Sequence, residues 1–441
     1  MKKKVLSLLL VAAMGISMLV GCGGGQTSGN NTENQNTQGS ENKGPVDITL
    51  TVWAPSNQLC MDPNAETPVY DGVLIQQMAA FAEANKDKWN ITWEYAAVGE
   101  DNLYTNISTD PKVGADVFFY AADQTAAMVE QGIIAQLGGT TKQMVEQNID
   151  KYVYDTVSVD GKLYGIPFTH NTFIMYYDKT LLTADDVKTM EGIMAKDLGD
   201  GAFNFHFDAA GGWKGGAWYY GAGLQIYGAS GVEYDKGCDW NNATGLAVTN
   251  YLIDLIGNAK KVAYGEEANV SEKFGEHKLG ACFDGSWNYS SYEKELGENL
   301  GVAVLPTATI DGKEVQLRSF YGAKAIGVNA QSTTARGNAA AAVAFAAYLG
   351  NTENQKLRYE LSAQVPADKT AAAQIEGTTL AVIYSEQVAN YTVIQPSNSN
   401  FSDNYWTAAG GLFEGINNGE VTKANAQEKL NKFVEAMKNI K

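Results

Sequence analysis

Residues 47–54 read Asp-Ile-Thr-Leu-Thr-Val-Trp-Ala, with an aliphatic side chain at every second position and Thr or Trp between them. This period of two predicts a half-buried β-strand. Apolar residues at helical spacing then predict a helix over 72–85, and two further apolar runs predict strands over 89–95 and 114–120. Because strands alternate with helices, we expect an α/β body with a mostly parallel sheet.

The second half of the chain also mixes strands and helices, but its loops differ in composition. Residues 201–231 are crowded with glycine and aromatic side chains. Further elements are predicted here, namely strands near 279–283, 300–305 and 323–328, a helix over the Ala-rich run 338–349, and a helix that begins at Thr422 as N-cap. A body of about 395 residues exceeds the size at which one core stops growing, so about two domains are expected.

The N-terminus has the features of an export signal. Lysines at 2–4 precede an apolar run over 5–20, which is shorter than a bilayer span of roughly 20 residues but suits a signal peptide. The run ends in Leu-Val-Gly-Cys at 19–22, which resembles the bacterial lipobox. That resemblance implies a signal peptide over 1–21 and a lipid on Cys22. An ordinary secretory signal with a chance cysteine is the alternative.

Residues 22–46 are predicted to form a flexible tether. After Cys22 they are mostly Gly, Asn, Gln, Ser, Thr, Glu and Lys, with no aliphatic or aromatic side chain before Val46. This composition cannot bury enough apolar surface to offset its ordering entropy. As a coil the segment would span roughly 25–30 Å. Since no second apolar run of spanning length follows, we expect a soluble body, lipid-anchored at the extracytoplasmic face of the cell membrane.

Charge and cysteine content exclude several classes of protein. The formal net charge is −18, which repels phosphate backbones and anionic headgroups, so nucleic acid is excluded as a partner and an anionic ligand is disfavoured. Beyond Cys22, Cys60, Cys238 and Cys282 form no C-x-x-C motif and no metal-type spacing. Buried thiols are favoured over one disulfide, and neither a metal nor a cofactor is expected.

Catalytic motifs are absent from the sequence. It contains no G-x-S-x-G, no H-E-x-x-H, no G-x-x-x-x-G-K-[ST] and no G-x-G-x-x-G after a strand. The three histidines, His170, His206 and His277, share no spacing with Cys or acidic residues that suggests a ligand set. The chain is therefore predicted not to be an enzyme. A pair of carboxylates for glycoside hydrolysis stays open, because 50 acidic residues allow many pairings.

Aromatic residues give the positive signal. The chain has 8 Trp and 23 Tyr, and many lie in short polar, glycine-containing segments such as 212–218, 284–289 and 404–406. A Trp flanked by Gly and Asn is poorly placed to fill a core. It is well placed to offer a flat face to the apolar side of a sugar ring, while carboxylates and amides bind the hydroxyls. These clusters favour a sugar-binding groove over packing at a domain edge.

The same residues resemble the extracellular solute-binding proteins of carbohydrate ABC importers, and the maltose/maltodextrin-binding group most closely, over essentially the whole body. The order and spacing of seven segments carry the likeness: Thr49–Trp53, Gly114–Asp123, Asp160–Pro167, Tyr176–Leu182, Asp284–Trp287, Gly301–Thr307 and Tyr405–Trp406. The resemblance implies a two-lobe α/β fold of the periplasmic-binding-protein type, with discontinuous lobes joined by hinge strands. It places the N-lobe at 47–168 and 307–350, and the C-lobe at 169–306 and 351–441.

The resemblance also implies a ligand set, which is Tyr120, Asp123, His170, Asn171, Trp213, Trp218, Trp287, Tyr289, Tyr405 and Trp406. Asn171 stands where the family often has a Glu, and neighbouring His170 is a candidate for the polar role. The register of the segment with Trp213 and Trp218 is not fixed by the likeness. The implied protein is a monomeric lipoprotein that closes on a neutral oligosaccharide, with maltose or maltodextrin as first choice. It would deliver this ligand to the membrane subunits of an ABC importer.

Three alternatives remain beside this interpretation. A surface glycoside hydrolase or lyase would need two carboxylates flanking the scissile bond. A sugar sensor or adhesion receptor would share the fold without feeding a transporter. Within the binding class, a peptide or polyamine ligand is open, although the combination of aromatics and amides argues for sugar.

Overall fold

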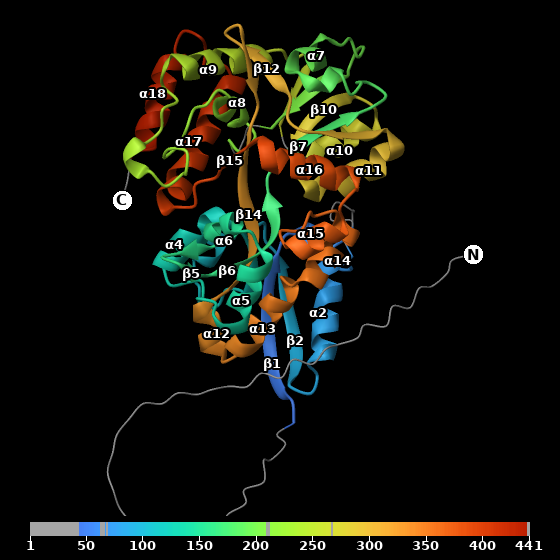
Figure 1. Ribbon diagram of the computed structural model, residues 1–441, viewed down its shortest axis with the longest axis vertical. Coiled ribbons are helices and arrows are strands. Elements are labelled where there is room, and N and C mark those ends of the chain that lie inside the picture. The colour runs from blue at the N-terminus through green and yellow to red at the C-terminus, as the bar shows by residue number, and fades with distance from the viewer. Residues whose placement is uncertain (1–43, 62–66, 68, 209–211, 266–267, 439–441) are drawn as a thin grey trace, which may run out of the picture. The chain divides into compact units, whose positions relative to one another are not determined.

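Figure 1 shows the computed structural model, which describes residues 44–61, 67, 69–208, 212–265 and 268–438. The predicted signal peptide, Cys22 and the predicted tether up to residue 43 lie outside these residues. Within the described ranges, no helix is both long enough and apolar enough to cross a membrane. The same ranges hold no group of three or more His, Cys, Asp or Glu side chains placed to bind a metal ion.

The N-lobe is built mainly from the first third of the chain. Its elements there are β1 Val46–Ala54, α1 Ser56–Leu59, α2 Val73–Ala84, β2 Trp89–Ala97, α3 Leu103–Ile107, β3 Val117–Ala121, the 3-10 helix η1 Ala122–Gln124, α4 Thr125–Glu130, α5 Gly139–Asn148, α6 Lys151–Thr156, β4 Ser158–Val159, β5 Lys162–Leu163 and β6 Gly165–Asn171. The chain later returns with β14 Ser319–Val328, α12 Ala330–Arg336, α13 Ala339–Leu349, α14 Thr352–Ser362 and α15 Lys369–Gln374. The short strand β15 Thr392–Ile394 pairs with the start of β14, where the chain passes between the lobes.

One mixed sheet forms the centre of the N-lobe. Its strand order is β15-β14-β3-β1-β2, with β6 also paired to β14. β1 is parallel to β2 and β3, whereas β14 is antiparallel to β3 and β6. The strands predicted over 47–54, 89–95 and 114–120 correspond to β1, β2 and β3. Helices α2 and α13 pack on this sheet through Phe345, which lies 5.0 Å from Phe81 and 4.8 Å from Trp93 between ring centroids.

The C-lobe takes the middle and the end of the chain. Its elements are β7 Ile174–Asp178, η2 Asp186–Lys188, α7 Met190–Ala195, β8 Phe203–Phe207, α8 Ala217–Gly221, η3 Tyr234–Lys236, α9 Ala243–Ile256, β9 Val262–Tyr264, α10 Ala268–Gly275, β10 Leu279–Asp284, η4 Ser286–Asn288, α11 Tyr289–Leu296, η5 Gly297–Asn299, β11 Leu300–Ala303, β12 Thr307–Ile310, β13 Lys313–Gln316, α16 Thr379–Asn390, α17 Ser399–Asn417 and α18 Ala426–Ala436.

The C-lobe sheet is buried on both faces. Its order is β11-β7-β10-β8-β9, with β8, β9 and β10 parallel. Met175 and Tyr177 of β7 belong to one apolar cluster, with residues of α9, α17 and α18. Ile174 and Tyr176 belong to another, with residues of α11 and α16. This alternation follows from the period of two in a strand, and both faces are covered as expected for an α/β sheet.

Two strands connect the lobes and are tied to each other. β6 continues into β7 through Thr172, whose hydroxyl lies 2.6 Å from the hydroxyl of Ser319 at the start of β14. Tyr384 of α16 donates a hydrogen bond to the carbonyl of His170 at 3.0 Å. In Figure 1, β14 extends from the N-lobe sheet toward the elements of the C-lobe. β6 and β14 are therefore the hinge strands of the molecule.

Packing places two lobe boundaries differently from the sequence expectation. The β12–β13 hairpin carries Ala308 and Ile310, which are buried in the C-lobe cluster, although the N-lobe was expected to resume at 307. Helix α14 carries Arg358, which donates to Gln58 and Gln77 of the N-lobe, although the C-lobe was expected to resume at 351. From these contacts we infer that the chain crosses between the lobes a second time within β14 and a third time between α15 and α16.

Candidate functional site

The loops that follow the parallel strands hold the charged and aromatic side chains of interest. Glu100 follows β2 and Asp123 follows β3 in the N-lobe, while Trp213 follows β8 and Trp287 follows β10 in the C-lobe. In open α/β sheets, ligands bind outside the carboxyl ends of the strands. By this rule the loops at the carboxyl ends of the strands are the candidate binding edge of each lobe, with acidic residues on the N-lobe and indoles on the C-lobe.

Asp123 of the N-lobe forms hydrogen bonds with side chains of the C-lobe. Its Oδ2 accepts a hydrogen bond from Trp406 Nε1 at 3.1 Å, and its main-chain carbonyl accepts one from Ser402 Oγ at 2.7 Å, both from α17. Oδ1 is buried and receives no hydrogen bond from any other residue that the structure describes. Because burial disfavours the charged form, the pKa of Asp123 is raised to about 7, and the Trp406 hydrogen bond opposes this rise. The Oδ1 atom of Asp123 therefore suits a hydrogen bond with a ligand hydroxyl, as donor while the carboxyl is protonated and as acceptor once it is ionised.

Because the pKa of Asp123 is raised, this residue should make the free energy of unfolding depend on pH. Comparison with Asp123→Asn measures that contribution. Folded Asp123 holds its proton up to about pH 7, whereas the unfolded carboxyl titrates near 3.8, so its contribution to the free energy of unfolding falls as pH rises through this window. Acidification from about pH 7.5 to about 5.5 should stabilise the wild type by about 2 kcal/mol relative to Asp123→Asn. Urea unfolding of both proteins at each pH measures this difference.

The comparison between the two proteins matters because another buried group acts in the opposite direction. Burial lowers the pKa of His170 to about 4. The contribution of His170 to the free energy of unfolding therefore falls as pH drops below the unfolded value near 6.5. Both proteins contain His170, and its effect cancels in the difference. Parallel stability profiles for wild type and Asp123→Asn would contradict the buried, protonated state of Asp123.

Trp213 and Trp287 form an aromatic pair at the edge of the C-lobe. Both side chains are half-buried, their ring centroids lie 5.6 Å apart and their planes differ by 26°. Trp213 also meets Phe173 edge to face, with centroids 4.8 Å apart. The Trp287 indole lies directly on the backbone of Gly285, where an added Cβ would be 2.2 Å from Cη2. Glycine at 285 therefore allows the ring to take this position.

A buried ionic network fixes the strand end that carries Trp287. Asp284 Oδ1 accepts from the Gly285 amide at 2.7 Å, and Oδ2 accepts from Asn288 Nδ2 at 2.9 Å and from the Tyr292 hydroxyl. Lys214 Nζ lies 3.7 Å from Asp284 Oδ1 and 3.4 Å from Asp208 Oδ2. Since Lys214 follows Trp213, the network fixes the backbone beside both indoles.

Lys324 and Glu100 join this site from the N-lobe, and neither was predicted from the sequence. Lys324 Nζ of β14 lies 3.2 Å from Glu100 Oε2 and 3.7 Å from the ring centroid of Trp287. Two sequence signals point to them in retrospect. Glu100 follows a predicted strand at its carboxyl end, and Lys324 is a lone charge inside the apolar strand predicted at 323–328.

His170, Asn171 and Tyr289 lie at or next to the hinge. His170 Nδ1 is 2.8 Å from the Tyr321 hydroxyl, and its lowered pKa makes it a neutral hydrogen-bonding group at pH 7. Asn171 ends β6 and is largely buried. Tyr289 is half-buried and donates to Glu293 Oε1 at 3.0 Å. Their roles as ligand contacts remain predictions.

Three other predicted ligand residues lie inside the apolar cores. Tyr120, Trp218 and Tyr405 each expose 0% of their surface. Thr125 donates to the Tyr120 hydroxyl at 3.3 Å, and Tyr405 donates to the Gly212 carbonyl at 3.1 Å. Trp218 packs against Phe207 and Phe283 at 5.3 and 5.7 Å between centroids. Since these rings fill cores, we do not include them in the proposed site.

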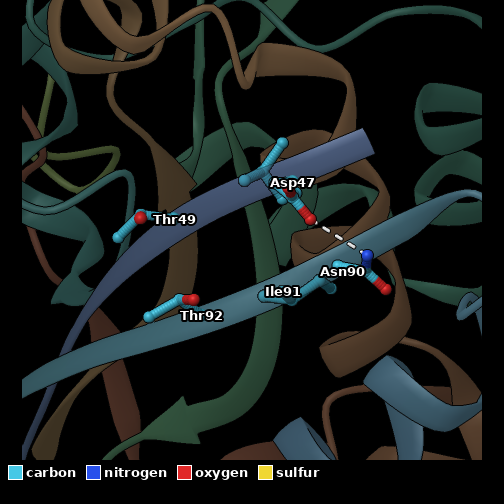
Figure 2. Close-up of a pocket in the computed structure, with 6 residues that line it drawn as sticks. Asp47, Thr49, Asn90, Ile91 and Thr92 are labelled. Atoms are coloured by element: carbon cyan, nitrogen blue, oxygen red, sulfur yellow. Dashed lines mark hydrogen bonds between the residues drawn. The ribbon is translucent and has the colours of Figure 1, made fainter. Parts of the chain in front are cut away.

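Figure 2 shows a surface hollow at the opposite end of the N-lobe sheet, which is not a second candidate. Its lining is the start of β1 and β2: Asp47, Ile48, Thr49, Asn90, Ile91 and Thr92. Asn90 Nδ2 donates to Asp47 Oδ1 at 2.9 Å, so these polar groups already bind each other. The hollow lies at the amino ends of the parallel strands and has no aromatic ring in its lining.

Comparisons with known proteins agree on one class. A family model described as bacterial extracellular solute-binding protein matches residues 76–391. A galactooligosaccharide-binding protein of Bacillus subtilis is 29% identical, over 84% of this chain and 82% of that protein. A maltooligosaccharide ABC transporter solute-binding lipoprotein of Streptococcus pneumoniae is 28% identical, over 69% of this chain and 70% of that protein. A solved structure with acarbose is 32% identical, with a TM-score of 0.80, over 89% of this chain and 99% of its own.

Proposed function

The chain belongs to the bacterial extracellular solute-binding protein family, and we propose that it captures a neutral oligosaccharide, with maltooligosaccharides as first choice, for an ABC importer. The matched family and the curated relatives are binding proteins, so the prediction that the chain is not an enzyme is confirmed. The proposal rests chiefly on one observation, which is that half-buried indoles of the C-lobe lie close to buried acidic residues of the N-lobe: Trp406 donates to Asp123, and Trp287 lies against Lys324, which is paired with Glu100.

The chemistry of this edge suits sugars. Trp213, Trp287 and Trp406 offer flat apolar surfaces, and Asp123 and Glu100 offer carboxylate oxygens to hydroxyls. By analogy with bases that stack on aromatic side chains, each stacked ring would contribute about 1–3 kcal/mol. Micromolar capture needs about −8 kcal/mol. Three stacked rings approach this value before hydrogen bonds are added and association costs are subtracted.

The names of the relatives point to two classes of ligand, maltooligosaccharides and galactooligosaccharides. The name of the Streptococcus pneumoniae relative specifies maltooligosaccharides, and the similar solved structure holds acarbose. The name of the Bacillus subtilis relative specifies galactooligosaccharides, which makes them the second candidate. The presence of three half-buried indoles, Trp213, Trp287 and Trp406, favours linear α-glucans, whose successive rings present apolar faces along one side of the chain. We therefore place maltose and maltodextrins first.

The hinge strands β6 and β14 suggest how capture would occur. A ligand that contacts both lobes favours the closed state through its differential affinity for that state, and hinge closure is how periplasmic binding proteins enclose ligands. We further propose that Cys22 carries the lipid anchor and that a monomer presents the ligand to the transporter's membrane subunits. The lipoprotein name of one relative supports the anchor.

A thermal-shift panel tests the proposed ligand class. The protein is heated with maltose, maltotriose, maltohexaose, cello-oligosaccharides, xylo-oligosaccharides or galacto-oligosaccharides at millimolar concentration. A ligand present at about 100 times its Kd stabilises the folded state by about 2.7 kcal/mol. We expect a clear rise of Tm with the maltose series and little with cello- or xylo-oligosaccharides. A rise with galacto-oligosaccharides alone would select the second candidate, and no rise with any glycan would reject the proposal.

A further inference from the structure

The indole face that a sugar ring would need is already covered by a side chain of the other lobe. Lys324 Nζ lies 3.7 Å from the Trp287 ring centroid, well within the roughly 6 Å over which a cation is attracted to an aromatic face. Only 11% of the Lys324 side chain is exposed. Because desolvation strengthens such contacts, this interaction belongs to the stronger part of their range.

An ion pair holds Lys324 in this position, and an irregularity in the strand pairing lies beside it. Glu100 Oε2 lies 3.2 Å from Nζ, and the Glu100 side chain is itself 9% exposed. The register between β14 and β6 shifts between Lys324 and Ala325, because β6 inserts Phe168 between the residues paired with them. Bulges re-aim side chains and are frequent beside functional sites.

We propose that Lys324 is a built-in competitor for the sugar-stacking face of Trp287. This inference rests on the proposed function, because it assumes that a sugar ring stacks on this indole. A sugar ring and an ammonium 3.7 Å from the centroid cannot occupy the same face, so the ammonium leaves when the sugar binds. The affinity of the protein is thus set below the value that its aromatic site alone would give.

Glu100 can bind the Lys324 ammonium after it leaves the indole ring. Its Oε1 is buried and has no hydrogen-bond partner among the described residues, while Oε2 holds the lysine. Lys324 can therefore swing off the ring without losing its counter-charge. The pair together is neutral, so the exchange suits an uncharged ligand.

Calorimetric titration with maltotriose tests this competition in four proteins: wild type, Lys324→Ala, Glu100→Gln and the double variant. We expect Lys324→Ala to bind about 5- to 30-fold more tightly than wild type, as expected for the loss of a desolvated cation–π contact. The double variant should exceed Glu100→Gln by a similar factor, which shows that the gain does not come from an unpaired Glu100. Lys324→Arg keeps a cation that stacks on the ring and should stay within about 3-fold of wild type. Equal or weaker binding by Lys324→Ala in both backgrounds would overturn the proposal.

A second measurement separates this inference from the proposed function. The indole N–H resonance of Trp287, assigned with Trp287→Phe, is recorded for wild type and Lys324→Ala without ligand. Loss of the cation should shift this resonance, and an unchanged resonance would show that Lys324 does not cover the ring. If the resonance shifts but no glycan binds either protein, the proposed function fails while the Lys324–Trp287 contact stands.

Discussion

Oligosaccharide binding is expected to be lost in the double variant Trp287→Ala/Trp406→Ala, without unfolding of the protein. Each indole would stack on one sugar ring at about 1–3 kcal/mol, so the pair accounts for a loss of affinity between about 30-fold and about 10⁴-fold. Removal of Trp406 also deprives Asp123 Oδ2 of its hydrogen bond from Nε1 at 3.1 Å, which leaves a buried carboxyl without its partner. Calorimetric titration with maltotriose measures the loss.

The fold should survive because both side chains are only half-buried: Trp406 packs at the rim of the C-lobe core, and Trp287 lies in the loop after β10, outside that core. Far-UV circular dichroism and Tm check this point. Trp89→Ala is the matched control, since Trp89 is also half-buried but begins β2, at the opposite end of the strand from the binding edge. This control should bind maltotriose like the wild type. Retained affinity in the folded double variant would exclude these two indoles from the site.

Trp218→Ala should have the reverse effect, with a large loss of stability. Trp218 exposes 0% of its surface and packs against Phe205, Phe207 and Phe283 in the C-lobe cluster. Truncation of a buried Trp to Ala leaves a cavity and costs about 3–5 kcal/mol. Since native domains are stable by only about 5–15 kcal/mol, much of the fold's stability would be lost. Urea unfolding followed by circular dichroism measures the change in the free energy of unfolding.

A milder variant separates packing from binding at the same position. Trp218→Phe keeps an aromatic ring in the core and should lower the free energy of unfolding less than Trp218→Ala does. Its affinity for maltotriose should equal that of the wild type, because Trp218 does not reach the binding edge. A folded Trp218→Phe protein that no longer binds sugar would return this residue to the ligand set.

Much of the fold was predictable from local patterns in the sequence. The alternation in residues 47–54 and the apolar run at 114–120 identify β1 and β3, because a period of two marks strands and a continuous apolar run marks a strand buried on both faces. The two-lobe α/β fold, predicted from the resemblance, is confirmed by the solved structure with 32% identity and a TM-score of 0.80. The lobe boundaries were harder, since the β12–β13 hairpin and α14 carry no sequence mark of the lobe on which they pack.

The site was predictable only in part, because composition does not reveal which aromatic residues fill a core. Trp213 and Trp218 lie in the same glycine-rich segment, yet Trp218 is in helix α8 and fully buried, whereas Trp213 is in the preceding loop and half-buried. Tyr405 and Trp406 are adjacent in α17, yet Tyr405 is fully buried and Trp406 is half-buried. Composition does not distinguish these two positions either. The role of Lys324 could not be predicted from the sequence, because its contact with Trp287 joins two residues that are far apart in the chain and belong to different lobes.

We expect this chain to bind a neutral oligosaccharide at the edge formed by indoles and acidic side chains, without altering the sugar. Calorimetric titration of maltotriose into the wild-type protein, followed by chromatography of the recovered sugar, measures both properties. We expect saturable binding at one site with a Kd near the micromolar range or tighter, and maltotriose recovered intact. Absence of binding heat together with an unchanged Tm, or recovery of glucose and maltose, would contradict the claim.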